Sequence, residues 1–124
     1  MTVFVIGGAG ALGRAFIDVA LQQGHRTVCI DLHPNPVAHH NLSPYAAYGA
    51  LDEMASEGEG EGNVVVCAAG SWSGGALRQF DPVEVDNLVE TNLKPALWSA
   101  GLAHHLPNTS LILTSAHATL SQGG

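Results

Sequence analysis

The chain has 124 residues, enough for one domain with a single core; 46% of them are apolar and only 12% are charged. This composition excludes an intrinsically disordered protein, and the formal net charge of −7 argues against a surface that binds nucleic acid or anionic membranes. The sequence contains no apolar stretch of membrane-spanning length, and its N-terminus does not have the pattern of a signal or transit peptide. We therefore expect a cytoplasmic protein with no membrane partner.

The N-terminal stretch predicts a strand, a glycine-rich turn and a helix in direct succession. An apolar run over 3–6 leads into Gly8-x-Gly10-x-x-Gly13, and the helical spacing of apolar residues then continues to Gln23 through Leu12, Ala15, Phe16, Val19 and Ala20. This is the dinucleotide-binding fingerprint, in which one glycine permits the turn, one lets the backbone approach a pyrophosphate and one lets the helix pack on the strand. The pyrophosphate would lie over free N–H groups at the helix N-terminus.

An acidic residue stands where this fold needs one. The second predicted strand, 26–31, ends at Asp31, about 20 residues past the glycines, where a carboxylate accepts the ribose hydroxyls of the adenosine. Because Asp31 would repel a 2′-phosphate and no arginine follows it, the sequence predicts NADH as cofactor in preference to NADPH. The alternative is an aspartate that only caps a loop.

The rest of the chain continues the alternation of helix and strand. The patterns predict a loop with at most a short edge strand (33–44), a helix (45–57), a strand (63–70), a helix from an Asp81-Pro82-Val83-Glu84 cap to about His105, and a strand (110–115). Pro95 should disturb the long helix. On that helix, Leu97 and Trp98 are predicted to belong to the core or to a dimer surface.

Strands that alternate with helices predict an α/β fold: a Rossmann-type doubly wound parallel sheet of order 3-2-1-4-5, forming one dinucleotide-binding domain over 1–124. The carboxyl ends of the strands should meet at one crevice. The predicted cofactor-binding residues there are Gly7, Gly8, Gly10, Ala11, Leu12, Gly13, Asp31, Ala68, Ala69 and Gly70.

The cysteines and histidines predict no further chemistry. Cys29 and Cys67 each sit in an apolar strand and are expected to be buried, reduced thiols. The seven histidines include two adjacent pairs, but adjacent side chains point in different directions and no spacing completes a tetrahedral site. No metal is predicted.

These motifs resemble the short-chain dehydrogenase/reductase family over the whole chain, and within it the dihydropteridine reductase group. The family features are the glycine-rich turn, Cys67-Ala68-Ala69-Gly70 after the fourth strand, Asn92 in the long helix and Ser115 after the fifth strand. Two stretches are typical of the group: Gly-Gly-x-Gly-Ala-Leu-Gly at the turn, and the run from Cys67 to Gly75 that contains Trp72.

The resemblance implies NADH-dependent reduction of a quinonoid dihydropteridine to the tetrahydropteridine. Ser115 would orient the pterin substrate, Asn92 would hold a helix kink and a proton-relay water, and Trp72 would stack on the pterin ring. Alternatively, Ser115 ends a strand, Asn92 satisfies the backbone near Pro95, and Trp72 anchors a loop. The family resemblance also implies a homodimer formed through the long helix.

The family's Tyr-x-x-x-Lys pair is missing. It should follow Ser115 by about a dozen residues, and neither Tyr45 nor Tyr48 has a lysine four residues later. We therefore expect the N-terminal part of a longer reductase, truncated before its last strands. An inactive nucleotide-binding fragment and a short-chain reductase of another substrate are the alternatives.

Overall fold

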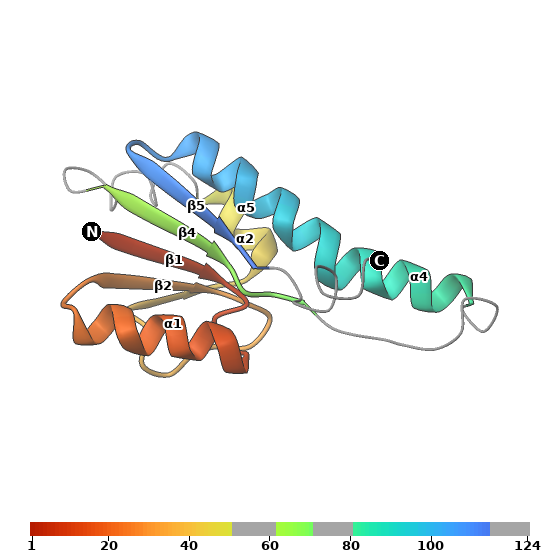
Figure 1. Ribbon diagram of the computed structural model, residues 1–124, viewed down its shortest axis with the longest axis horizontal. Coiled ribbons are helices and arrows are strands. Elements are labelled where there is room, and N and C mark those ends of the chain that lie inside the picture. The colour runs from red at the N-terminus through yellow and green to blue at the C-terminus, as the bar shows by residue number, and fades with distance from the viewer. Residues whose placement is uncertain (51–61, 71–80, 115–124) are drawn as a thin grey trace, which may run out of the picture.

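The computed structural model describes residues 1–50, 62–70 and 81–114, which form one sheet with helices on both faces (Figure 1). The elements are β1 (Thr2–Ile6), α1 (Ala11–Gln22), β2 (Arg26–Ile30), β3 (His40–Leu42), α2 (Pro44–Gly49), β4 (Asn63–Cys67), α4 (Pro82–Leu88), the π-helical turn η2 (Val89–Leu93), α5 (Lys94–His105) and β5 (Thr109–Leu113).

The sheet has the order β3-β2-β1-β4-β5 and every pair of neighbours is parallel, so the predicted topology is confirmed. β1 lies in the middle, with Thr2 in register with Arg26 on one side and with Asn63 on the other. The predicted short edge strand exists as the three residues of β3. Since parallel strands end at the same edge, the turns that follow β1, β2 and β4 lie side by side.

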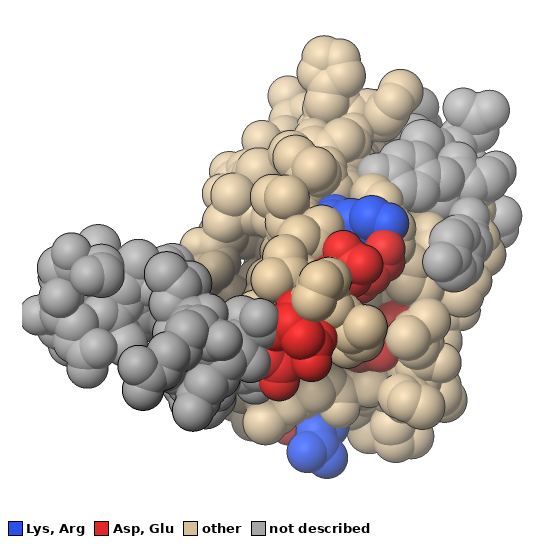
Figure 2. Space-filling view, turned by 90° about the vertical axis from the view of Figure 1, so that its right-hand side faces the viewer, with Lys and Arg blue, Asp and Glu red and all other residues tan. Residues whose placement is uncertain are grey.

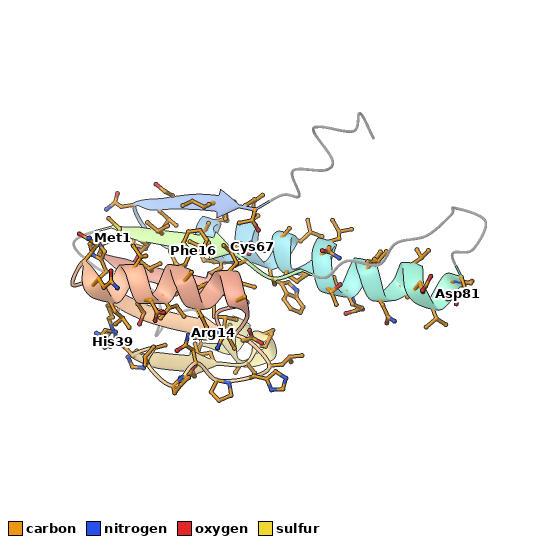
Figure 3. The ribbon with its side chains drawn as sticks, turned by 60° about the horizontal axis from the view of Figure 1, so that its bottom comes forward. Met1, Arg14, Phe16, His39, Cys67 and Asp81 are labelled. Carbon is orange, nitrogen blue, oxygen red and sulfur yellow. The ribbon has the colours of Figure 1, made fainter. Side chains whose placement is uncertain are left out.

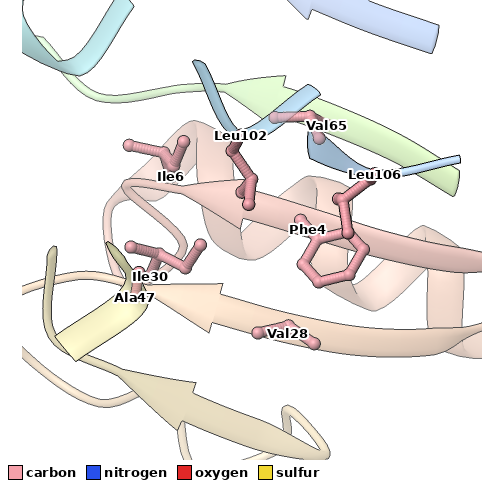
Figure 4. Close-up of a cluster of buried hydrophobic side chains, with 8 residues drawn as sticks. All are labelled: Phe4, Ile6, Val28, Ile30, Ala47, Val65, Leu102 and Leu106. Atoms are coloured by element: carbon pink, nitrogen blue, oxygen red, sulfur yellow. The ribbon is translucent and has the colours of Figure 1, made fainter. Parts of the chain in front are cut away.

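Alternate residues of the strands face two separate cores. Phe4 and Ile6 point to the face covered by α2 and α5, where they pack with Val28, Ile30, Ala47, Val65, Leu102 and Leu106 (Figure 4). Val3 and Val5 point to the face covered by α1. β1 is buried throughout, because neighbouring strands flank it and helices cover both of its faces.

The helix predicted after the glycine-rich turn is present as α1, and only part of its apolar set faces the sheet. Its buried residues are Gly13, Ile17 and Ala20, while Leu12 and Val19 are exposed. The predicted helix is therefore confirmed, and contact with Cys29 and Val66 of the sheet determines which side of it turns inward.

The predicted long helix runs as α4, η2 and α5, and part of it extends beyond the sheet, with Asp81 at the far tip (Figure 3). Asp81 caps it as expected, its Oδ1 accepting from the Glu84 backbone N–H at 2.8 Å. The π-helical turn ends just before Pro95, which has no N–H to donate to the preceding turn. The disturbance predicted at Pro95 thus takes the form of a widened turn.

Cys29 and Cys67 are free and buried, as expected. Within the part of the chain that the structure describes, no helix is long and apolar enough to cross a membrane.

Candidate functional site

A cleft of about 350 Å³ opens at the edge where the strands end, between the sheet and the long helix. Three groups of residues line it: the ends of β1, β2 and β4, the start of α2, and one side of η2 and α5. They are Ile6, Gly7, Ile30, Asp31, Leu32, Pro44, Ala69, Gly70, Glu90, Thr91, Pro95 and Trp98.

Two glycines of the turn are required by backbone packing. Gly7 has a φ of +84°, and a Cβ on it would stand 2.6 Å from the Ala69 backbone nitrogen. A Cβ on Gly13 would stand 2.0 Å from the Gly7 carbonyl oxygen. Neither position has room for a side chain, so these glycines bring α1 and the segment after β4 against the end of β1.

Gly8 is held from beneath by the core. A Cβ there would meet the Cys29 sulfur at 2.7 Å and the Ile17 Cδ1 at 2.8 Å. Burial raises the pKa of the Cys29 thiol; the backbone N–H of Asn35 lowers it and the Asp31 carboxylate raises it further. Cys29 therefore stays a neutral packing group under the turn.

Gly10 differs from the other glycines of the turn. Among the described residues, a Cβ there would meet only the Gly7 carbonyl oxygen, at an ordinary 3.5 Å, and the φ of −76° suits any residue. No side chain of the described residues caps α1 at this position. Protein packing thus gives no reason for a glycine at Gly10, but the open space beside uncapped helix N–H groups fits the phosphates of a dinucleotide.

Asp31 stands at the mouth of the cleft and is bonded to two backbone groups. Its Oδ2 accepts from the Ala9 N–H at 3.0 Å and its Oδ1 accepts from the His33 N–H at 3.2 Å. The carboxylate therefore caps its own loop, as the alternative interpretation expected, and also lines the cleft, as the cofactor interpretation requires.

The face that contains the cleft is acidic near its middle (Figure 2). Asp31 and Glu90 both line the cleft, and Lys94 forms an ion pair with Glu90 four residues away. The lining residues that the structure describes include no lysine or arginine. Arg14, in the first turn of α1 (Figure 3), is exposed and does not belong to this lining.

The remaining predicted residues fall in three groups. Ala69 and Gly70 line the cleft, and Ala68 donates its N–H to the Ile6 carbonyl oxygen at 2.8 Å. Ala11 and Leu12 are exposed at the start of α1. Ser115 and Trp72 lie outside the described residues.

Asn92 lies in the π-helical turn, next to the segment after β4. Its side-chain nitrogen donates to the Leu88 carbonyl oxygen at 3.1 Å and lies 3.1 Å from the Thr91 hydroxyl, while its Oδ1 would stand 2.9 Å from a Cβ on Gly70. It therefore satisfies helix backbone at the kink. Its role towards a relay water stays a prediction.

Sequence reasoning missed three contributors. Trp98 is half-buried and lines the cleft, whereas it was expected in the core or on a dimer surface. Glu90 lines the same cleft, and Asn35 is buried behind the glycine turn. The Pro34-Asn35-Pro36 run was the one available signal, since an asparagine between prolines favours a side-chain-bonded turn.

Within residues 1–50, 62–70 and 81–114, no group of three His, Cys, Asp or Glu side chains is arranged to hold a metal ion. The site there consists of backbone N–H groups, the Asp31 and Glu90 carboxylates and a largely apolar cleft.

No family model matches the chain. In sequence, the chain is 30% identical to the dihydropteridine reductase of Dictyostelium discoideum over 127 residues, which cover 97% of this chain and 55% of that protein. The chain thus spans about half the length of this curated relative.

Solved structures share the fold. A short-chain dehydrogenase/reductase superfamily protein from Agrobacterium tumefaciens with bound NAD matches with a TM-score of 0.71 at 18% identity, over 100% of this chain and 35% of that one. A human epimerase family protein with NADPH matches with a TM-score of 0.61 at 22% identity, over 95% of this chain and 37% of that one. With the relative from Dictyostelium, these likenesses confirm the resemblance to short-chain dehydrogenase/reductases that the motifs suggested.

Proposed function

We propose that this chain is the nucleotide-binding part of a dihydropteridine reductase, and that its cleft binds NADH. The observation that carries the proposal is the turn at Gly10, which no described side chain caps and where the packing of the described residues does not require a glycine. Two further points support a nicotinamide cofactor: the acid at the end of β2, and the NAD and NADPH named with the structural neighbours.

Each part of the site has a role in this proposal. The N–H groups at the start of α1 would bind the pyrophosphate, with Gly10 leaving room for it. The Asp31 carboxylate would accept the ribose hydroxyls, and Leu32 and Trp98 would supply apolar surface for the adenine. The bound dinucleotide would supply hydride chemistry.

The preference for NADH rests on charge. Asp31 and Glu90 both line the cleft, and a 2′-phosphate on the ribose would lie against them without a basic partner among the described lining residues. This repulsion should therefore make the binding of NADPH weaker than the binding of NADH.

The proposal of a pterin substrate rests on the likeness to the Dictyostelium enzyme and on the sequence run from Cys67 to Gly75. In this proposal Trp72 stacks on the pterin, Ser115 orients it, and Asn92 holds a relay water. The printed sequence contains no Tyr-x-x-x-Lys pair to donate the proton.

A homodimer through the long helix is part of the proposal for the whole reductase. Val85, Leu93 and Leu97 expose 48%, 52% and 61% of their surface at a spacing of one or two helical turns. A second copy of the same helix would cover this stripe about a two-fold axis. Sedimentation of wild type against Leu97→Glu tests it, because a charge there should yield a monomer.

The proposed function is tested by titrating the chain with NADH and with NADPH. Trp98 lines the cleft, so its fluorescence should be quenched as NADH binds, and Trp98→Phe should lower that signal without abolishing binding. We expect saturable binding of NADH, weaker binding of NADPH, and NADH binding weakened by about 2–3 kcal/mol in Gly10→Val. Failure of both nucleotides to bind would overturn the proposal.

A further inference from the structure

A buried asparagine contacts the glycine-rich turn from the loop between β2 and β3. Asn35 exposes only 1% of its surface, and its side-chain nitrogen donates to the Gly8 carbonyl oxygen at 2.9 Å. Burying an amide costs free energy unless its hydrogen bonds are satisfied. A fully buried asparagine bonded to a residue 27 positions away is therefore a specific feature of this fold.

Asn35 is itself held rigidly. Its Oδ1 accepts from the Val37 N–H at 3.0 Å, its own N–H donates to the Asn41 Oδ1 at 2.7 Å, and its carbonyl oxygen accepts from the Asn41 side-chain nitrogen at 3.0 Å. The amide that reaches Gly8 thus cannot rotate without losing other bonds.

The Gly8 carbonyl and the Ala9 N–H are the two ends of one peptide group. Asn35 bonds the oxygen end, and Asp31 Oδ2 accepts from the nitrogen end at 3.0 Å. Because a peptide group is planar, rotating it would break both bonds at once. Two side chains of one loop therefore fix the orientation of the peptide that leads into Gly10.

We propose that Asn35 is a positioning residue for nucleotide binding, which holds the Gly8–Ala9 peptide so that Gly10 and the first N–H groups of α1 face the cleft. This inference rests on the proposed function. It assigns Asn35 a task that Asp31 cannot perform alone, because a carboxylate that bonds to a ribose has less capacity left for the Ala9 N–H. Asn35 is buried and is not among the residues that line the cleft, so its amide does not compete with a ligand for its bond to Gly8.

The test replaces Asn35 by leucine, which has a similar volume and cannot donate, and by serine, which suits the turn but is too short to reach Gly8. For both variants we expect the Kd for NADH to rise about tenfold, the scale of leaving one buried carbonyl unpaired. The Kd for adenosine, which has no phosphate, should change less than about twofold. Without nucleotide, the Ala9 amide should exchange its hydrogen about tenfold faster.

Asn63→Leu is the matched control. Asn63 is also buried, at 3% exposure, and donates to the Pro107 carbonyl oxygen at 2.8 Å, but it lies at the start of β4, at the opposite edge of the sheet. This variant should lose stability and keep the wild-type affinity for NADH and the wild-type exchange rate at Ala9.

The outcomes separate the inference from the proposed function. Equal loss of NADH and adenosine affinity in the Asn35 variants, equal loss of NADH affinity in Asn63→Leu, or unchanged binding and Ala9 exchange in the Asn35 variants would each overturn the positioning role. If wild type bound no NADH, the proposed function would fall. Ala9 exchange in the ligand-free variants would then still decide whether Asn35 fixes the peptide.

Discussion

The glycine-rich turn and the long helix border the same cleft but are held in different ways. At the turn, Gly7 and Gly13 are in backbone contact with their surroundings, and two side chains fix the peptide before Gly10. None of the residues of α4, all of which the structure describes, is buried, and four of the five residues of β5 are exposed. The glycine-rich turn is thus held in place by contacts with residues that precede α4 in the chain. By contrast, α4 and β5 leave exposed surfaces that are free for further contacts.

The largest expected effect concerns catalysis. The residues proposed to bind the nucleotide all lie within the 124-residue chain, so this chain should bind NADH. It should not oxidise NADH with a quinonoid dihydropterin at a rate near that of the Dictyostelium reductase, because a missing general acid costs ~10²–10⁴ in rate. NADH absorbance at high protein concentration measures this. Equal rates for the two proteins would show that the proton donor lies among these residues.

The next effect is on stability, at Gly13. Gly13→Ala would place a Cβ 2.0 Å from the Gly7 carbonyl oxygen, so α1 must move off the sheet at a cost of about 3 kcal/mol. Gly24→Ala is the control. Gly24 has a φ of +79°, but no atom of residues 1–50, 62–70 or 81–114 lies within 4 Å of a Cβ placed there, so the change should cost ~1 kcal/mol of conformational strain. Urea denaturation compares the two, and equal costs would contradict close packing at Gly13.

Gly10→Val should separate binding from folding. A Cβ at this position is in ordinary contact with the described residues, so we expect the unfolding free energy to stay within about 0.5 kcal/mol of wild type. It would occupy the space proposed for the pyrophosphate and weaken NADH binding by about 2–3 kcal/mol, the scale of charged hydrogen bonds. Circular dichroism and a calorimetric titration on one sample check both parts. Wild-type affinity would mean that Gly10 belongs to an ordinary turn.

A smaller effect is expected on the choice of nucleotide. Asp31→Asn removes the charge and keeps an oxygen to accept from Ala9, and it should shift the preference between NADH and NADPH by about 1–2 kcal/mol towards NADPH. Asp31→Ala should also relax the preference for NADH over NADPH. Because it removes the acceptor of the Ala9 N–H as well, it should weaken the binding of both nucleotides. Titration of the three proteins with both nucleotides tests this, and tighter binding of NADPH by wild type would contradict it.

The smallest expected effect is a pH dependence of the unfolding free energy that comes from Cys29, which lies beneath the glycine-rich turn. Burial raises the pKa of the Cys29 thiol above its value in the unfolded chain. Above about pH 8.5 the unfolded state therefore binds fewer protons, and the unfolding free energy falls as pH rises towards the folded-state pKa, by at most about 1.4 kcal/mol per pH unit. Urea denaturation at pH 8 and pH 10 should show a smaller fall for Cys29→Ala than for wild type. Equal falls would assign the loss to other groups.

Local patterns were enough to predict the order of the elements and the parallel sheet. The glycine spacing, the helix caps and the apolar runs are signals that extend over only a few residues. They predict the Asp81 cap directly, and the alternation of strands and helices that they define predicts the strand order. The inward face of α1 could not, since Ile17 faces inward because of contacts with the sheet. Asn35 and Trp98 were missed for the same reason, because their partners are distant in sequence.

Amide chemical shifts of the ligand-free and NADH-bound chain test the central claim most directly. NADH should shift the amides of Gly7–Gly13, Asp31, Ala69 and Gly70, where the strands end, and leave those of His25, Arg26 and Asn108 unchanged at the opposite edge of the sheet. Shifts confined to that opposite edge, or no shifts at saturating NADH, would contradict a nucleotide site at the glycine-rich turn.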